Sequence, residues 1–73
     1  MTKAEAEAAI RYLVHQWAAE QTAEQLRRPS FFSFKEWLSR KGYAHYLSFR
    51  SVTGAEYDAD MWFNAELKQR WRL

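Results

Sequence analysis

Apolar residues recur at helical spacing in the first third of the chain. The spacing i, i+3, i+4, i+7, which places side chains on one face of an α-helix, is occupied by Ile10, Leu13, Val14 and Trp17. Thr2 and Glu5 form a capping box, in which each side chain satisfies a backbone N–H group at the helix start. The pattern predicts a long first helix from Thr2 to Arg28.

That helix is too long for a domain of this size. A helix from Lys3 to Arg28 measures about 39 Å at about 1.5 Å per residue, whereas the radius of gyration expected for so short a chain is about 11 Å. We therefore expect either that the helix bends near Gln21 and Thr22 or that its second half overhangs and meets a partner.

Pro29 marks the boundary between the first helix and the second. Proline lacks a backbone N–H group and its ring clashes with the preceding turn, so the first helix is expected to end just before it. Ser33 and Glu36 form a second capping box, which predicts a helix from Ser33 to about Lys41. Gly42 follows as a candidate left-handed C-cap.

The last helix is predicted from Ala55 to about Arg72. Thr53 and Glu56 form a third capping box immediately before it. Acidic residues in its first turns and basic residues in its last turns complement the helix dipole. Its core stripe at helical spacing consists of Ala59, Phe63, Leu67 and Trp71.

Two hydrophobic staples are predicted at the starts of the second and last helices. A staple joins the residue before the N-cap to a residue in the first helical turns, and so fixes the direction in which the chain enters the helix. The spacing fits Phe32 with Trp37 and Val52 with Tyr57.

The segment after Gly42 has a mixed pattern. Tyr43, Tyr46 and Leu47 keep helical spacing, so a short extra helix can follow directly. A strand within residues 47–52 has no evident pairing partner. Whether residues 43–52 form helix, strand or loop stays open at this point.

These patterns predict an all-α fold. We expect one compact domain, residues 1–73, with three main helices and a possible short extra helix after Gly42. Large aromatic side chains seldom stay exposed, so they dominate the predicted core. Its members are Trp17, Phe34, Trp37, Leu38, Phe63, Leu67 and Trp71.

Composition narrows the classes of protein. The 73 residues include five Phe, four Trp and four Tyr but no cysteine, which excludes disulfides and thiolate zinc sites. The longest apolar runs are far too short to span a bilayer, and the polar, acidic N-terminal segment is unlike a signal peptide. We therefore expect a soluble, cytoplasmic protein that does not act in membranes.

The sequence offers little for catalysis. His15 and His45 are far apart and lack the spacing of a metal motif. Asp58 and Asp60 do not continue as a calcium loop, and two glycines cannot make a glycine-rich phosphate loop. We expect a protein that is not an enzyme, with no cofactor or metal.

A surplus of apolar helix surface suggests a protein-interaction module. The first and last helices each carry a second apolar side, and three helices around one core bury only one stripe each. A protein partner or a second copy could bind there, unless a short helix within residues 43–49 covers the second side. The candidate partner-binding residues are Tyr12, Ala19, Ala23, Leu26, Met61 and Trp62, with Ala65 beside the last two.

Binding of nucleic acid is the alternative function. Residues 27–50 hold six basic residues against one acidic residue, although the net charge of the whole chain is only +2. Aromatic side chains such as Tyr43, Tyr46 or Phe31 could stack on bases. The candidate phosphate-binding residues are Arg27, Arg28, Lys35, Arg40, Lys41 and Arg50.

Overall fold

The predicted all-α fold is confirmed. The computed structural model describes the backbone of residues 1–70 and the side chains of residues 1–68. Within this part there is no strand, and the short extra helix after Gly42 is present as a 3-10 turn. The elements are α1 (Lys3–Ala19), α2 (Ala23–Arg27), α3 (Phe31–Lys41), η1 (Ala44–Leu47) and α4 (Ala55–Arg70).

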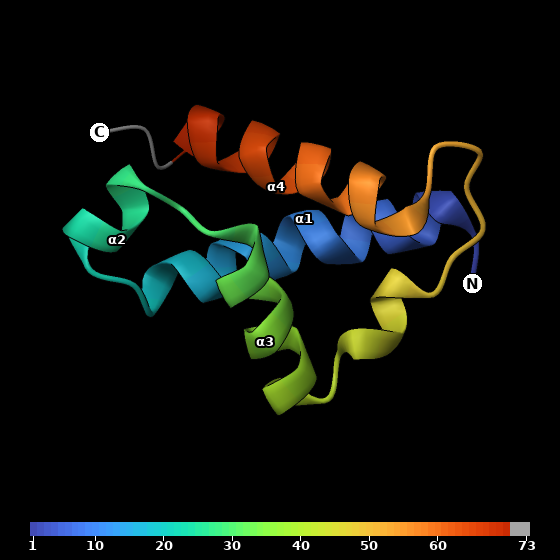
Figure 1. The fold of residues 1–73 in the computed structure, drawn as a ribbon, viewed down its shortest axis with the longest axis horizontal. Coiled ribbons are helices and arrows are strands. Elements are labelled where there is room, and N and C mark those ends of the chain that lie inside the picture. Colours follow the sequence, from blue (N-terminus) through green and yellow to red (C-terminus); the bar gives the residue numbers. More distant parts are fainter. Residues whose placement is uncertain (71–73) are drawn as a thin grey trace.

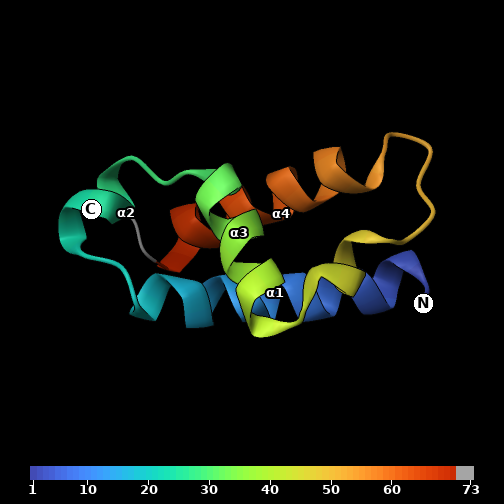
Figure 2. The ribbon, with the colours of Figure 1, turned by 60° about the horizontal axis from the view of Figure 1, so that its bottom comes forward.

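Helices α1 and α4 lie side by side and run in the same direction (Figure 1). Lys3 lies 3.4 Å from the carboxylate of Asp58 at one end of the pair, and Arg11 lies 2.7 Å from Glu66 further along. Helix α3 crosses the pair (Figure 2). The resulting molecule has a radius of gyration of 11.6 Å.

The first helix is interrupted where a bend was expected. α1 ends at Ala19, and α2 begins after Thr22, so the expectation of one helix as far as Arg28 is wrong and the bend near Thr22 is confirmed. The Thr22 hydroxyl accepts a hydrogen bond from the N–H of Gln25, whose side chain accepts in turn from the N–H of Thr22. This capping box, which was not predicted, starts a new helix in place of continuing the old one.

The N-cap of the second helix lies three residues earlier than predicted. Ser30 is its N-cap and accepts a hydrogen bond from the N–H of Ser33, so the predicted box of Ser33 with Glu36 is wrong. Phe32 is 66% exposed, which also contradicts its staple with Trp37. The early start gives α3 another turn at its N-terminal end.

Gly42 ends α3 as predicted. Its φ of 82° is left-handed, a conformation that glycine adopts without steric cost. Its N–H points back to the last carbonyl groups of the helix, as in a Schellman or αL cap.

The start of α4 differs from the prediction. The Thr53 hydroxyl donates to Asp58 in place of capping the helix through Glu56, and Gly54, with a φ of 104°, precedes the first helical residue. Val52 is fully exposed, so the predicted staple with Tyr57 is also wrong. The Thr53 hydroxyl thus bonds to the carboxylate of Asp58 and does not cap the helix.

The core is built around three rings from three helices. Phe63 of α4 lies with its ring centroid 5.2 Å from that of Trp17 and 5.1 Å from that of Phe34. Every predicted core residue within the described side chains is buried, and Trp71 lies outside the described residues. Within residues 1–70, none of the helices combines the length and the apolar character required to cross a lipid bilayer.

The ring of Trp37 is buried in the core. Its indole N–H is a buried donor that has no hydrogen-bond partner among the described residues, and leaving such a group unpaired costs about 1–3 kcal/mol. We expect Trp37→Ala to lower the free energy of unfolding by about 3–5 kcal/mol. Trp37→Phe removes the unpaired donor together with part of the ring, so the free energy of unfolding should fall by less than about 1 kcal/mol. Urea denaturation measures both values.

Trp17→Phe is the matched control for that experiment. It removes the same atoms from a tryptophan whose indole N–H is not left buried and unpaired. The control should therefore cost more than Trp37→Phe. Equal losses for the two phenylalanine variants would show that the unpaired donor of Trp37 has no energetic consequence.

Asp58 ties the loop before α4 to both long helices. Its side chain is 3% exposed, and the hydroxyls of Ser51 and Thr53 donate to its two carboxylate oxygens. The hydrogen bonds from Ser51 and Thr53 lower the pKa of Asp58 below its ordinary value of 3.8, against the opposing effect of burial, and Lys3 lowers it further.

Stability is therefore expected to depend on pH through Asp58. The pKa of Asp58 is lower in the folded state than in the unfolded state. The stabilisation that the ionised carboxylate contributes is therefore fully present above pH 3.8, the pKa in the unfolded chain, and is lost as the pH falls through the folded pKa. We expect Asp58→Asn to be less stable than the natural chain at pH 7. We also expect this variant to lose less stability than the natural chain when the pH is lowered below 3.8. Urea unfolding across this range of pH measures the difference. Asp60→Asn, which lies outside the cluster, should lose stability at low pH as the natural chain does. If Asp58→Asn lost as much stability at low pH as the natural chain, the prediction would be contradicted.

Candidate protein-binding surface

Helix α4 carries apolar residues on two sides. The inner side packs into the core through the buried residues Ala59, Trp62, Phe63 and Leu67. The outer side carries Tyr57 and Met61, which are 60% and 51% exposed, and the half-buried Ala65. In Figure 1, no other labelled helix lies on the side of α4 that faces away from α1.

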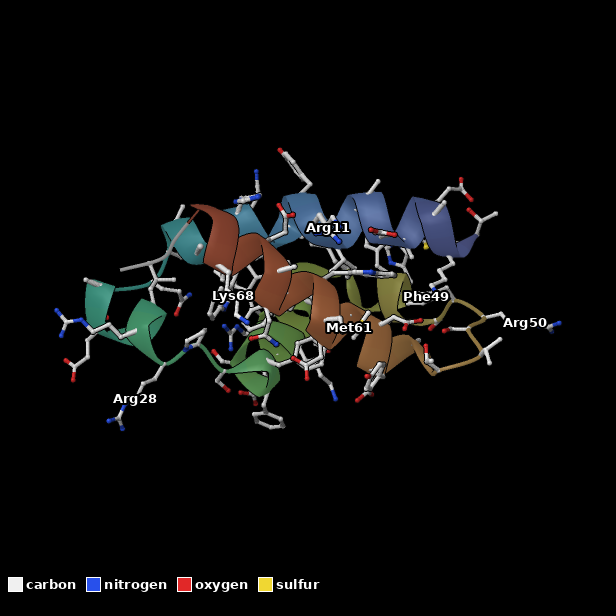
Figure 3. All side chains as sticks on the ribbon, turned by 90° about the horizontal axis from the view of Figure 1, so that it is seen from above. Arg11, Arg28, Phe49, Arg50, Met61 and Lys68 are labelled. Carbon is white, nitrogen blue, oxygen red and sulfur yellow. The ribbon has the colours of Figure 1, made fainter. Side chains whose placement is uncertain are left out.

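A shallow groove runs along the outer side of α4. Its residues form two rows of i, i+4 spacing, which are the ridges that helices use when they pack against each other. We call this feature the outer α4 groove, and its two rows are Tyr57, Met61 and Ala65, and Asp60, Asn64 and Lys68. Figure 3 looks onto α4 and shows Met61 and Lys68 along it.

The two rows differ in chemistry. One is apolar, whereas the other places a carboxylate, an amide and an ammonium group in series. Asn64 donates to the Asp60 carboxylate at 2.8 Å and to the Asp60 backbone carbonyl at 2.9 Å, which holds the two side chains together. Within the described part of the chain, neither Asp60 nor Lys68 forms an ion pair.

The predicted partner-binding residues do not share one surface. Met61 lies in the outer α4 groove, whereas Tyr12 is 63% exposed on α1, with its hydroxyl accepting from Gln16. Ala19 and Ala23 are exposed on either side of the break between α1 and α2. The remaining two residues, Leu26 and Trp62, turn towards the core.

Trp62 was expected on an exposed face, and that expectation is wrong. The side chain is 4% exposed and stacks on Phe49, with ring centroids 5.3 Å apart. Leu26 is half-buried and packs against the core. The segment after Gly42 therefore covers part of the second apolar side, which was the alternative considered from the sequence.

Most residues of the outer α4 groove were missed by the sequence analysis. Tyr57 was assigned to a local staple and Asp60 to helix-end electrostatics, while Asn64 and Lys68 received no role in binding. The signal that could have identified them is the pair of i, i+4 rows beginning at Tyr57 and Asp60. That signal is ambiguous without the fold, because either side of α4 could have faced the core.

The predicted phosphate-binding residues are dispersed. Arg28 and Arg50 lie at opposite ends of the molecule (Figure 3). Lys35 pairs with Glu56 at 2.8 Å, and Lys41 lies 3.9 Å from a carboxylate oxygen of Glu20. Arg27 and Arg40 are exposed on α2 and α3. The six basic residues do not form one continuous patch.

A series of aromatic rings follows the end of α3. The ring centroids of Trp37 and Tyr43 are 6.3 Å apart, and those of Tyr43 and Tyr46 are 6.2 Å apart. His45 lies 4.2 Å from Tyr46, and the ammonium group of Lys41 lies 5.9 Å from the Trp37 ring. Tyr43 and His45 are exposed, so part of this series is accessible to a ligand.

A polar cluster lies between α1 and α4. Glu66 accepts from Arg11 at 2.7 Å, and its other carboxylate oxygen lies 2.6 Å from Nε2 of His15. Burial raises the pKa of Glu66, but hydrogen bonds with His15 and Arg11 outweigh this and lower it below 4.5. The cluster joins the two helices, and in the part of the chain that the structure describes no three His, Asp or Glu side chains converge as a metal site requires.

Comparisons with protein-family models, with curated proteins and with solved structures found no match. Function is therefore inferred from surface geometry and charge alone.

Proposed function

We propose that this chain is a small, non-catalytic interaction module that binds a helix of a protein partner in the outer α4 groove. The observation that carries the proposal is the exposed apolar row of Tyr57, Met61 and Ala65 beside a polar row on the same helix. Exposed aromatic and methionine side chains next to polar groups are the composition of protein interfaces.

The shape of the groove favours a helical partner. Two i, i+4 ridges leave between them a channel into which a ridge of a second helix fits, in the commonest class of helix packing. The ridge of large residues, Tyr57 and Met61, ends at the small side chain of Ala65, where a partner can approach the backbone of α4 more closely. A flat sheet or an extended peptide has no comparable fit to these ridges.

Photo-crosslinking tests the proposed function. A photo-reactive benzoylphenylalanine at position 61, in cells that produce the chain naturally, should form adducts with a protein. The same group in place of Ser39, an exposed residue of α3, should form few. Adding Ala65→Glu to the position-61 variant should reduce the adducts at least about tenfold, because it places a charge in the groove.

Two outcomes would contradict the proposal. One is the absence of adducts from position 61, and the other is an equal yield from positions 61 and 39. Circular dichroism of Ala65→Glu is needed alongside, since a loss of adducts counts only for a variant that retains its helix content.

The aromatic series after α3 favours nucleic acid as a second candidate. Exposed rings can stack on the bases of a single strand, and Arg40 and Lys41 precede the exposed ring of Tyr43 closely in the chain. The carboxylate of Glu20 near Lys41 and the dispersal of the other basic residues count against a strong phosphate-binding surface.

The dispersal predicts a weak salt dependence for that candidate. If only Arg40 and Lys41 contact phosphates, the slope of log K against log salt for a single-stranded oligonucleotide should be no steeper than about −1.4. Contacts from all six basic residues would give about −4. An NMR titration at several salt concentrations measures the slope, and a slope near the larger value would show that the residues act as one surface after all.

A further inference from the structure

The charges of the outer α4 groove are complementary to themselves. Asp60 and Lys68 occupy the two ends of the polar row, with Asn64 midway between them. They are eight residues apart, or about 12 Å along the helix. If a second α4 lies antiparallel with its centre at Asn64, Asp60 of each copy faces Lys68 of the other.

One pair of residues in the apolar row fits a nearby centre. In an antiparallel pair centred at position 63, the large side chain of Met61 faces the small side chain of Ala65 in the other copy. This centre differs by one residue from the one that the charges indicate, so the residues that face each other differ by two, or about 3 Å along the axis. The charge pattern therefore sets the register, and the Met61–Ala65 pair fits it to within this offset.

We propose that the occupant of the outer α4 groove is a second copy of this chain, bound antiparallel about a two-fold axis near residues 63 and 64. This inference rests on the proposed function and specifies its partner. A two-fold interface is self-complementary, so each favourable contact occurs twice. One helix face buries less than the roughly 800 Å² per partner of standard interfaces, so we expect a weak, reversible dimer with Kd in the micromolar range.

Charge reversal followed by mixing tests this dimer. Asp60→Lys alone places two like-charged pairs in the interface, and so does Lys68→Asp alone. Each variant should therefore raise the dimer Kd at least about tenfold. An equimolar mixture of the two variants restores both opposite-charge pairs, so heterodimers should form with a Kd near that of the natural chain. Sedimentation equilibrium of the purified chains measures each Kd.

The double variant and a matched control complete the design. Asp60→Lys combined with Lys68→Asp in one chain should also restore the dimer, since both pairs are only exchanged. Arg40→Glu, a reversal of similar size on α3, should leave the Kd unchanged. Recovery in the mixture cannot be explained by a folding defect in either single variant, because mixing does not repair a chain that is unfolded.

Three outcomes would overturn the inference. The first is that the natural chain does not associate at any concentration reached, and the second is that the mixture of the two variants does not recover the dimer. The third is that Arg40→Glu weakens the dimer as much as the groove variants do. The crosslinking experiment separates these failures from failure of the proposed function. Adducts from position 61 with a different protein would leave the groove as a binding surface and exclude the second copy as its occupant.

Discussion

The packing of Phe63 against Trp17 and Phe34 is the contact on which the rest of the structure depends. It joins α4 to α1 and α3 at one point, with ring centroids about 5 Å apart, and nearly all of its area is removed from water. Because α1 and α4 are parallel neighbours, no short loop can connect them. The chain must travel back along the pair, and α2, α3 and η1 make that return.

This return path decides which surfaces stay exposed. The loop after η1 brings Phe49 over Trp62, so one apolar side of α4 becomes core. The opposite side, with Tyr57 and Met61, receives no such cover from the described residues. Charges divide in the same way: Asp58 and Glu66 are engaged in joining α4 to the loop and to α1, whereas those of the outer groove remain available to a partner.

Much of the fold follows from local patterns. The cap at Thr2, the left-handed Gly42 and the apolar stripes depend on neighbours within a few residues, so the sequence alone reveals them. Capping was predicted wrongly where two candidates compete. Ser30 and Ser33 are both able to cap α3, and Thr53 can bond either to its own helix or to Asp58, so the choice depends on contacts outside the segment.

The sequence by itself determined that this protein is a helical domain with an aromatic core, because helix periodicity and burial of large rings need no knowledge of the rest of the chain. Only the tertiary structure decided which side of α4 is the surface. Met61 and Trp62 are adjacent and both apolar, yet one is exposed and the other buried. The difference arises from Phe49, since a residue far from α4's own turns supplies the cover that local periodicity cannot specify.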